Sequence, residues 1–190
     1  MAGTFTAKYK DLMPIKEDVW IESGTYRGAG VANALRYGFS ELHTIEVSPT
    51  AFKALETSNP ELCVDPKIHR YLGSSRAVLR PILQAINPAR DVVFWLDGHY
   101  SGEAEQRDSV SECPLMAELD AILQTLWRGS VLVCIDDAYL FDDAYWTTGT
   151  LRGKFTASDW PRISQLKALM EGWRTHREDD ILYFWRDFRV

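Results

Sequence analysis

The stretch DVWIESGTYRGAG, residues 18–30, indicates the class of fold that we expect for this chain. Asp18–Glu22 is apolar at its centre and predicts a short buried strand, which leads directly into a turn containing three glycines. Glycine permits a sharp bend and lets the backbone approach a ligand closely. A helix is predicted from Gly30 to Tyr37. The stretch therefore indicates a strand, a glycine turn and a helix, in that order.

The alternation of strands and helices continues along the chain. Further strands are expected at Glu41–Glu46, Ile68–Leu72, Asp91–Asp97 and Ser130–Asp136, and helices at Ser48–Leu55, Ser74–Ile86, Pro114–Leu126 and Trp160–Met170. The strand runs DVVFWLD and SVLVCID are apolar almost throughout, which is typical of parallel strands buried on both faces. Residues 173–188 predict an antiparallel hairpin.

This pattern predicts an α/β fold in a single domain that covers residues 1–190. We expect a doubly wound, Rossmann-like, mostly parallel sheet of seven strands, with the antiparallel hairpin at its C-terminal end and helices on both faces.

Composition narrows the classes of partner. A net charge of −6 disfavours a nucleic-acid surface, which needs clustered Lys and Arg. No apolar run approaches the roughly 20 residues of a membrane span, and the N-terminus lacks the apolar core of a secretory signal. The three cysteines are widely spaced and suggest reduced thiols. We therefore expect a cytoplasmic protein whose partner is a small molecule, not a membrane or a nucleic acid.

An acidic residue at the end of the second strand points to a nucleoside cofactor. Glu46 occupies the position at which doubly wound folds bind ribose hydroxyls. The glycines are spaced G-x-x-x-G-x-G rather than G-x-G-x-x-G, which argues against an NAD-dependent oxidoreductase. The alternative is an ordinary strand-to-helix turn with a surface glutamate.

Carboxylates end the fourth and fifth strands. Asp97 closes one, and Asp136 and Asp137 close the other. Neighbouring strand ends meet at the ligand crevice, where three carboxylates would repel one another unless a cation compensated them. Oxygen ligands favour a hard ion such as Mg²⁺. Each Asp could instead cap a turn. His99 could act as a general base, or be an exposed loop histidine.

The stretch IESGTYRGAG resembles the first motif of class I S-adenosylmethionine-dependent methyltransferases. It is most similar to the E-x-G-T-Y/F-x-G form of the macrocin O-methyltransferase and cephalosporin hydroxylase-like group. This resemblance implies that Glu46 binds the ribose of S-adenosyl-L-methionine. The residues that it places around the methionine part are Glu22, Gly24, Thr25, Tyr26 and Gly28.

Two further segments carry the resemblance, which covers roughly residues 18–140. LGSSR resembles the segment beside adenine in catechol O-methyltransferase-like enzymes and implicates Ser75. DGHYSGE resembles a loop of the macrocin and cephalosporin group, and Asp97, Asp136 and Asp137 match the metal ligands of metal-dependent O-methyltransferases. The resemblance implies methyl transfer to a small hydroxylated acceptor, such as a sugar or natural product. Asp97 and His99 would be the catalytic residues, and Asp97 would also contact the cofactor.

Other functions are compatible with the same residues. The chain could be a non-catalytic module that binds S-adenosylmethionine or a nucleotide, or an accessory protein, because fold does not fix function. A glycosyltransferase usually separates its two Asp by one residue, whereas Asp136 and Asp137 are adjacent. The aromatic segment 138–160 is either a substrate lid or a cover of the core. Few residues precede the first strand, so a second subunit could complete the pocket in a homodimer.

Overall fold

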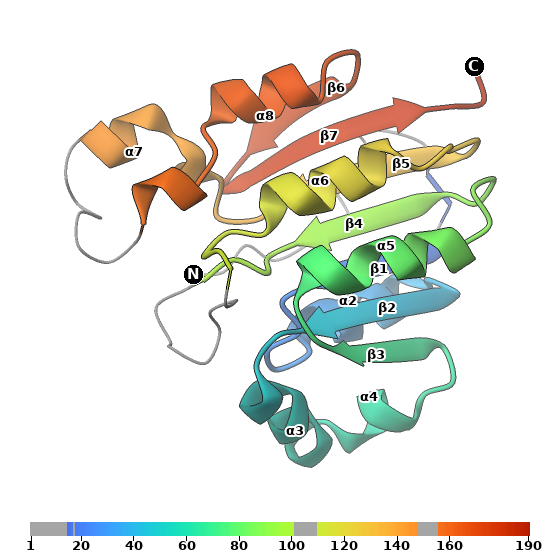
Figure 1. Cartoon of the computed structure of the whole chain (residues 1–190). Coiled ribbons are helices and arrows are strands. Elements are labelled where there is room, and N and C mark those ends of the chain that lie inside the picture. Colours follow the sequence, from blue (N-terminus) through green and yellow to red (C-terminus); the bar gives the residue numbers. More distant parts are fainter. Residues whose placement is uncertain (1–14, 17, 101–109, 148–155) are drawn as a thin grey trace.

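A computed structural model describes residues 15–16, 18–100, 110–147 and 156–190. Seven strands form one sheet in the order β3-β2-β1-β4-β5-β7-β6 (Figure 1). The first five are parallel, and β7 runs antiparallel to both β5 and β6. The strands are β1 Val19–Ser23, β2 Glu41–Glu46, β3 Ile68–Leu72, β4 Val92–Leu96, β5 Ser130–Ile135, β6 Arg174–Glu178 and β7 Ile181–Asp187. The predicted fold class and the terminal hairpin are confirmed.

Helices cover both faces of the sheet (Figure 1). The α-helices are α2 Ala29–Tyr37, α3 Pro49–Ser58, α4 Pro60–Val64, α5 Ser75–Ala85, α6 Leu115–Leu123, α7 Asp143–Thr147 and α8 Ile163–Leu169. Short 3₁₀ helices lie at η2 Ala138–Phe141 and η3 Ala157–Asp159. The short helices α4 and α7 were not predicted.

The last predicted helix was wrong at its start. Trp160 has an extended backbone, with φ −103° and ψ 116°, because a residue that precedes proline is disfavoured in the helical region. The helix therefore begins only at Ile163. Trp160 itself is buried in the core.

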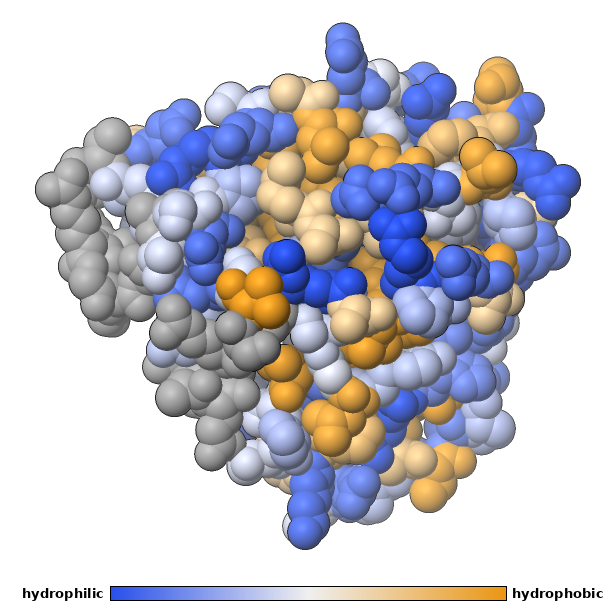
Figure 2. Space-filling model, viewed as in Figure 1, coloured by the Kyte–Doolittle hydropathy of each residue, from blue (hydrophilic) through white to orange (hydrophobic). Residues whose placement is uncertain are grey.

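The strand side chains alternate between two apolar clusters. Phe94 and Leu96 point into the cluster that α5, α6 and α8 cover, whereas Val93 and Trp95 point into the cluster beside α2. On the outer surface, Arg80 of α5 donates to Asp120 of α6 at 3.1 Å, and hydrophilic residues lie over these two helices (Figure 2). In the part of the chain that the structure describes, every helix is too short or too polar to cross a bilayer.

Strand register brings the predicted site together. Ser23, the last residue of β1, pairs with Ile45 on one side and with Leu96 on the other, and Leu96 pairs with Ile135. The residues that follow these strands therefore lie at one edge of the sheet, which is where doubly wound folds bind their ligands.

Candidate active site

The glycine turn after β1 packs directly against the end of β4. The amide of Gly24 donates to the carbonyl of Ile45 at 2.9 Å, and the residue has a φ of +86°. A Cβ at this position would lie 2.3 Å from the carbonyl oxygen of Asp97. Only glycine allows this approach, which joins the predicted cofactor turn to the predicted metal site.

Two side chains of the turn point into the protein. The Oε1 atom of Glu22 accepts a hydrogen bond from Thr44 at 2.7 Å, and its Oε2 atom accepts one from Trp20 at 3.1 Å. The hydroxyl of Thr25 bonds to the hydroxyl of Thr44. Burial raises the pKa of Glu22 to about 8, which favours the protonated form of this carboxyl. Glu22 and Thr25 therefore hold the turn from inside.

Glu46 links the turn to the end of β2. Its Oε2 atom accepts the backbone N–H of Tyr26, and its Oε1 atom accepts that of Ser48, both at 2.8 Å. Each carboxylate oxygen has a second lone pair, so Glu46 can still accept two hydroxyl donors. Tyr26 has a φ of +43° and an exposed ring, and Gly28 is the N-cap of α2.

The loops after β4 and β5 bring three ligating side chains together. The Nε2 atom of His99 lies 3.0 Å from Oδ2 of Asp137 and 3.9 Å from Oδ1 of Asp97. One ligand atom from each residue lies within 4.8 Å of the others. Two of the three predicted metal ligands therefore meet, and His99 joins them.

His99 is buried, so the interpretation as an exposed loop histidine was wrong. Its ring packs edge-on against Trp160, with centroids 5.3 Å apart, and against Phe141 at 6.3 Å. Burial alone lowers the pKa of His99. The hydrogen bond to Asp137 and the charge of Asp97 outweigh that effect and raise the pKa above its usual value.

Asp136 lies outside this group of three. It is fully buried. It is the first residue after β5, and the charged groups near it are Asp97, Asp137 and His99. The left-handed backbone of Asp137, with φ +51°, turns the next carboxylate toward His99. Burial and the charge of Asp97 raise the pKa of Asp136 to about 7. The geometry thus assembles Asp97, His99 and Asp137 in place of the predicted aspartate triad.

Solved structures of methyltransferases share this architecture, although no family model and no curated protein matches the sequence. A candidate rRNA methylase from Clostridium thermocellum superposes with a TM-score of 0.57 at 11% identity, over 95% of this chain and 93% of that one. The methyltransferase PaMTH1 of Podospora anserina, solved with S-adenosylhomocysteine bound, gives 0.56 at 16% identity, over 90% and 71%. This chain has the Rossmann-like methyltransferase fold.

A third neighbour of the same fold is an O-methyltransferase family protein from Burkholderia thailandensis. It gives a TM-score of 0.56 at 10% identity, and the match covers 90% of this chain but 50% of that longer one. At such identities the likeness is one of fold, and the chemistry has to be argued from the site residues themselves.

Within this methyltransferase fold, Glu118 is a site residue that the sequence analysis missed. It is 1% exposed and lies beneath Gly98, whose Cβ would be 3.5 Å from its Oε1 atom. Burial raises the pKa of Glu118, and the nearby hydroxyls of Ser75 and Ser23 partly oppose this effect. Among the described residues, no group forms a hydrogen bond with its Oε1 atom. Ser75, predicted beside adenine, is therefore buried against Glu118. The sequence feature that could have identified Glu118 is its position among the apolar residues of the predicted helix at Pro114–Leu126.

Glu118 and His99 also line a small cavity between β4, β5 and α6. The other lining residues are Leu96, Gly98, Pro114, Leu115, Ile135 and Phe141.

Glu112 is the second missed residue. It is buried and accepts hydrogen bonds from the backbone and the hydroxyl of Thr156, and from the indole of Trp160 at 3.3 Å. Because Trp160 packs on His99, Glu112 fixes the wall of the site. No feature of the sequence distinguished it from a solvated loop acid.

Most of the described aromatic residues of segment 138–160 pack in or against the core, whereas Tyr139 is exposed. Phe141 and Trp160 are buried, and the indole of Trp146 donates to the carbonyl of Leu140 at 2.6 Å. Residues 148–155 lie outside the described part of the chain. A substrate lid there stays a prediction.

Proposed function

We propose that this chain is a divalent-metal-dependent methyltransferase that moves a methyl group from S-adenosylmethionine to an oxygen of a small hydroxylated molecule. One observation carries the proposal. The turn at Gly24 touches the backbone of Asp97, so a cofactor held by the turn would lie beside the group formed by Asp97, His99 and Asp137.

The cofactor half is supported by the turn and by Glu46. A carboxylate at the end of the second strand suits two ribose hydroxyls, and the Glu46 oxygens keep the lone pairs needed to accept them. Because the turn contains glycine, its backbone can approach a ligand in the crevice closely. Binding of S-adenosylhomocysteine by a protein of the same fold agrees with this assignment.

The metal half is supported by the donor set. Two carboxylates suit Mg²⁺, and the imidazole of His99 extends the fit to Mn²⁺. A cation bound there would lower the pKa of an acceptor hydroxyl. His99 would hold this cation through Nε2, which lies 3.0 Å from Asp137 and 3.9 Å from Asp97, and the second carboxylate oxygen of Asp97 would accept the hydroxyl proton. The methyl transfer itself depends mainly on holding donor and acceptor in line.

Calorimetric titration with S-adenosylhomocysteine, with and without Mg²⁺, tests the cofactor half. We expect micromolar affinity. Transfer of a labelled methyl group from S-adenosylmethionine to a panel of catechols and sugars, with and without Mg²⁺, then tests the reaction. Binding without transfer to any acceptor would favour a non-catalytic module, and absence of binding would contradict the proposal.

A further inference from the structure

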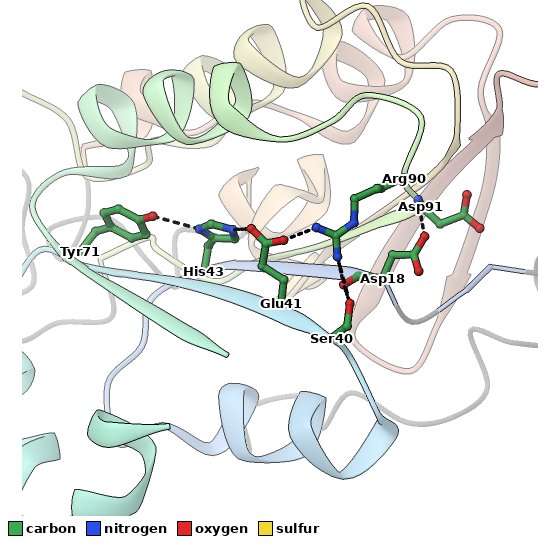
Figure 3. Close-up of polar contacts among 7 residues, drawn as sticks. All are labelled: Asp18, Ser40, Glu41, His43, Tyr71, Arg90 and Asp91. Carbon is green, nitrogen blue, oxygen red and sulfur yellow. Dashed lines mark hydrogen bonds and ion pairs between the residues drawn. The ribbon is translucent and has the colours of Figure 1, made fainter. Parts of the chain in front are cut away.

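A second cluster of ligating side chains lies away from the crevice. Glu41 opens β2 and Glu46 closes it, so the cluster around Glu41 belongs to the opposite end of the strand. Figure 3 shows a chain of polar contacts that runs from Tyr71 through His43 and Glu41 to Arg90. None of these residues takes part in the proposed methyl transfer.

The strand register brings two histidines together beside Glu41. His43 and His69 are paired residues of β2 and β3, and their rings stack with centroids 4.8 Å apart and planes inclined by 23°. The Nε2 atom of His43 lies 2.9 Å from Oε1 of Glu41. One ligand atom from each of Glu41, His43 and His69 lies within 4.8 Å of the others.

We propose that Glu41, His43 and His69 form a site for a borderline transition metal, with Zn²⁺ the best fit. Zinc binds imidazole nitrogen and carboxylate oxygen at about 2.0–2.2 Å in tetrahedral geometry. Two such ligands lie about 3.4 Å apart, so the contact between His43 and Glu41 opens by a few tenths of an ångström. His69 is exposed and free to turn its ring, and a water molecule completes the tetrahedron.

The neighbours of the cluster orient its ligands. Tyr71 hydroxyl lies 3.0 Å from Nδ1 of His43. When the metal binds Nε2, the single imidazole proton moves to Nδ1 and is donated to the Tyr71 oxygen, so His43 stays neutral and releases no net proton. Arg90 binds the other oxygen of Glu41, and is itself held by the carbonyl of Asp18 at 2.8 Å. Such outer contacts fix ligand orientation in metal sites.

The donor set selects against hard ions. Mg²⁺ and Ca²⁺ need several oxygen ligands, whereas this cluster offers two imidazoles and one carboxylate that is shared with Arg90. A bound zinc would tie β3, which lies at the edge of the sheet, to β2, which carries Glu46. The site would therefore stabilise the strand that presents the ribose-binding carboxylate.

The test uses the Asp137→Asn variant as host, because this change is expected to weaken metal binding at the crevice. Calorimetric titration of the host with ZnCl₂ is expected to show one bound zinc, and titration with MgCl₂ none at this cluster. Adding His69→Ala should weaken zinc binding about tenfold or more. Adding His176→Ala, which removes an exposed histidine beside Glu178 on β6, should leave the affinity unchanged.

Co²⁺ gives an independent readout. The host should show the visible absorption of tetrahedral cobalt, and the His69→Ala variant should lose it. Because His69 is exposed, this variant should keep its circular dichroism spectrum. A host that binds no zinc, or a His69→Ala variant that binds zinc as tightly as the host, would overturn the proposal.

Discussion

The Oδ2 atom of Asp137 lies 3.0 Å from Nε2 of His99, and this contact joins the loop after β4 to the loop after β5. Asp137 has a left-handed backbone, with φ +51°, and presents this carboxylate from the turn that follows β5. The contact places an acid and an imidazole beside Asp97, next to the glycine turn. The proposed chemistry rests on this arrangement.

Replacing Asp137 with Asn should weaken Mn²⁺ binding at the crevice about tenfold or more while preserving the fold. Asn tolerates the left-handed conformation that Asp137 adopts, so the backbone is not strained. Titration followed by the paramagnetic resonance signal of free Mn²⁺ measures the affinity. Asp143→Asn, on an exposed carboxylate of α7, is the matched control. Equal affinities in the two variants would contradict the assignment.

Glu46→Gln should weaken S-adenosylhomocysteine binding about tenfold, which corresponds to about 1.4 kcal/mol. The amide replaces one acceptor oxygen with a donor, which cannot accept a ribose hydroxyl. Glu61→Gln, on an exposed residue of α4, controls for the change in net charge. Calorimetry gives both affinities, and a Glu46→Gln variant that binds like the control would remove Glu46 from the cofactor site.

Glu22 should make the stability of the protein depend on pH. Burial raises its pKa from 4.5 to about 8 in the folded protein, so unfolding releases its proton between these two values. The free energy of unfolding should therefore decrease as the pH rises through this window, by at most about 1.4 kcal/mol per pH unit from this group. Urea unfolding at pH 5 and pH 8 should show a smaller decrease in Glu22→Gln. Equal decreases in both proteins would contradict the burial of this carboxyl.

Gly24→Ala should destabilise the protein by about 2–4 kcal/mol, because the new methyl group would meet the carbonyl of Asp97 in a left-handed conformation. Gly38→Ala is the matched control. Gly38 has a φ of +92° but nothing within 4 Å of its Cβ position, so only the backbone cost of about 1 kcal/mol remains. Thermal unfolding measures the stability of both variants. Similar losses of stability would contradict the close contact between Gly24 and Asp97.

Periodicity and strand-end residues were enough to predict the sheet. The apolar runs ending at Asp97 and Asp136, and the glycine turn after Glu22, each indicated a parallel strand with a polar end. Helix bounds depended on finer effects, such as the restriction that Pro161 places on Trp160.

The site was predicted only in part, because the spacing of residues along the sequence does not determine the direction in which each side chain points. The sequence placed Asp136 and Asp137 together but did not show that Asp137 would be the one to contact His99. Glu118 and Glu112 act through contacts with residues distant in the sequence, Gly98 and Trp160. Such contacts need the packed structure.

The most direct test is whether the metal and the cofactor share one crevice. Mn²⁺ can be added to the protein saturated with S-adenosylmethionine that carries ¹³C in its transferable methyl group, while the methyl resonance is followed by NMR. We expect strong paramagnetic broadening in the wild-type protein and its loss in Asp137→Asn. A sharp methyl resonance in the wild-type protein, with both Mn²⁺ and cofactor bound, would contradict this expectation.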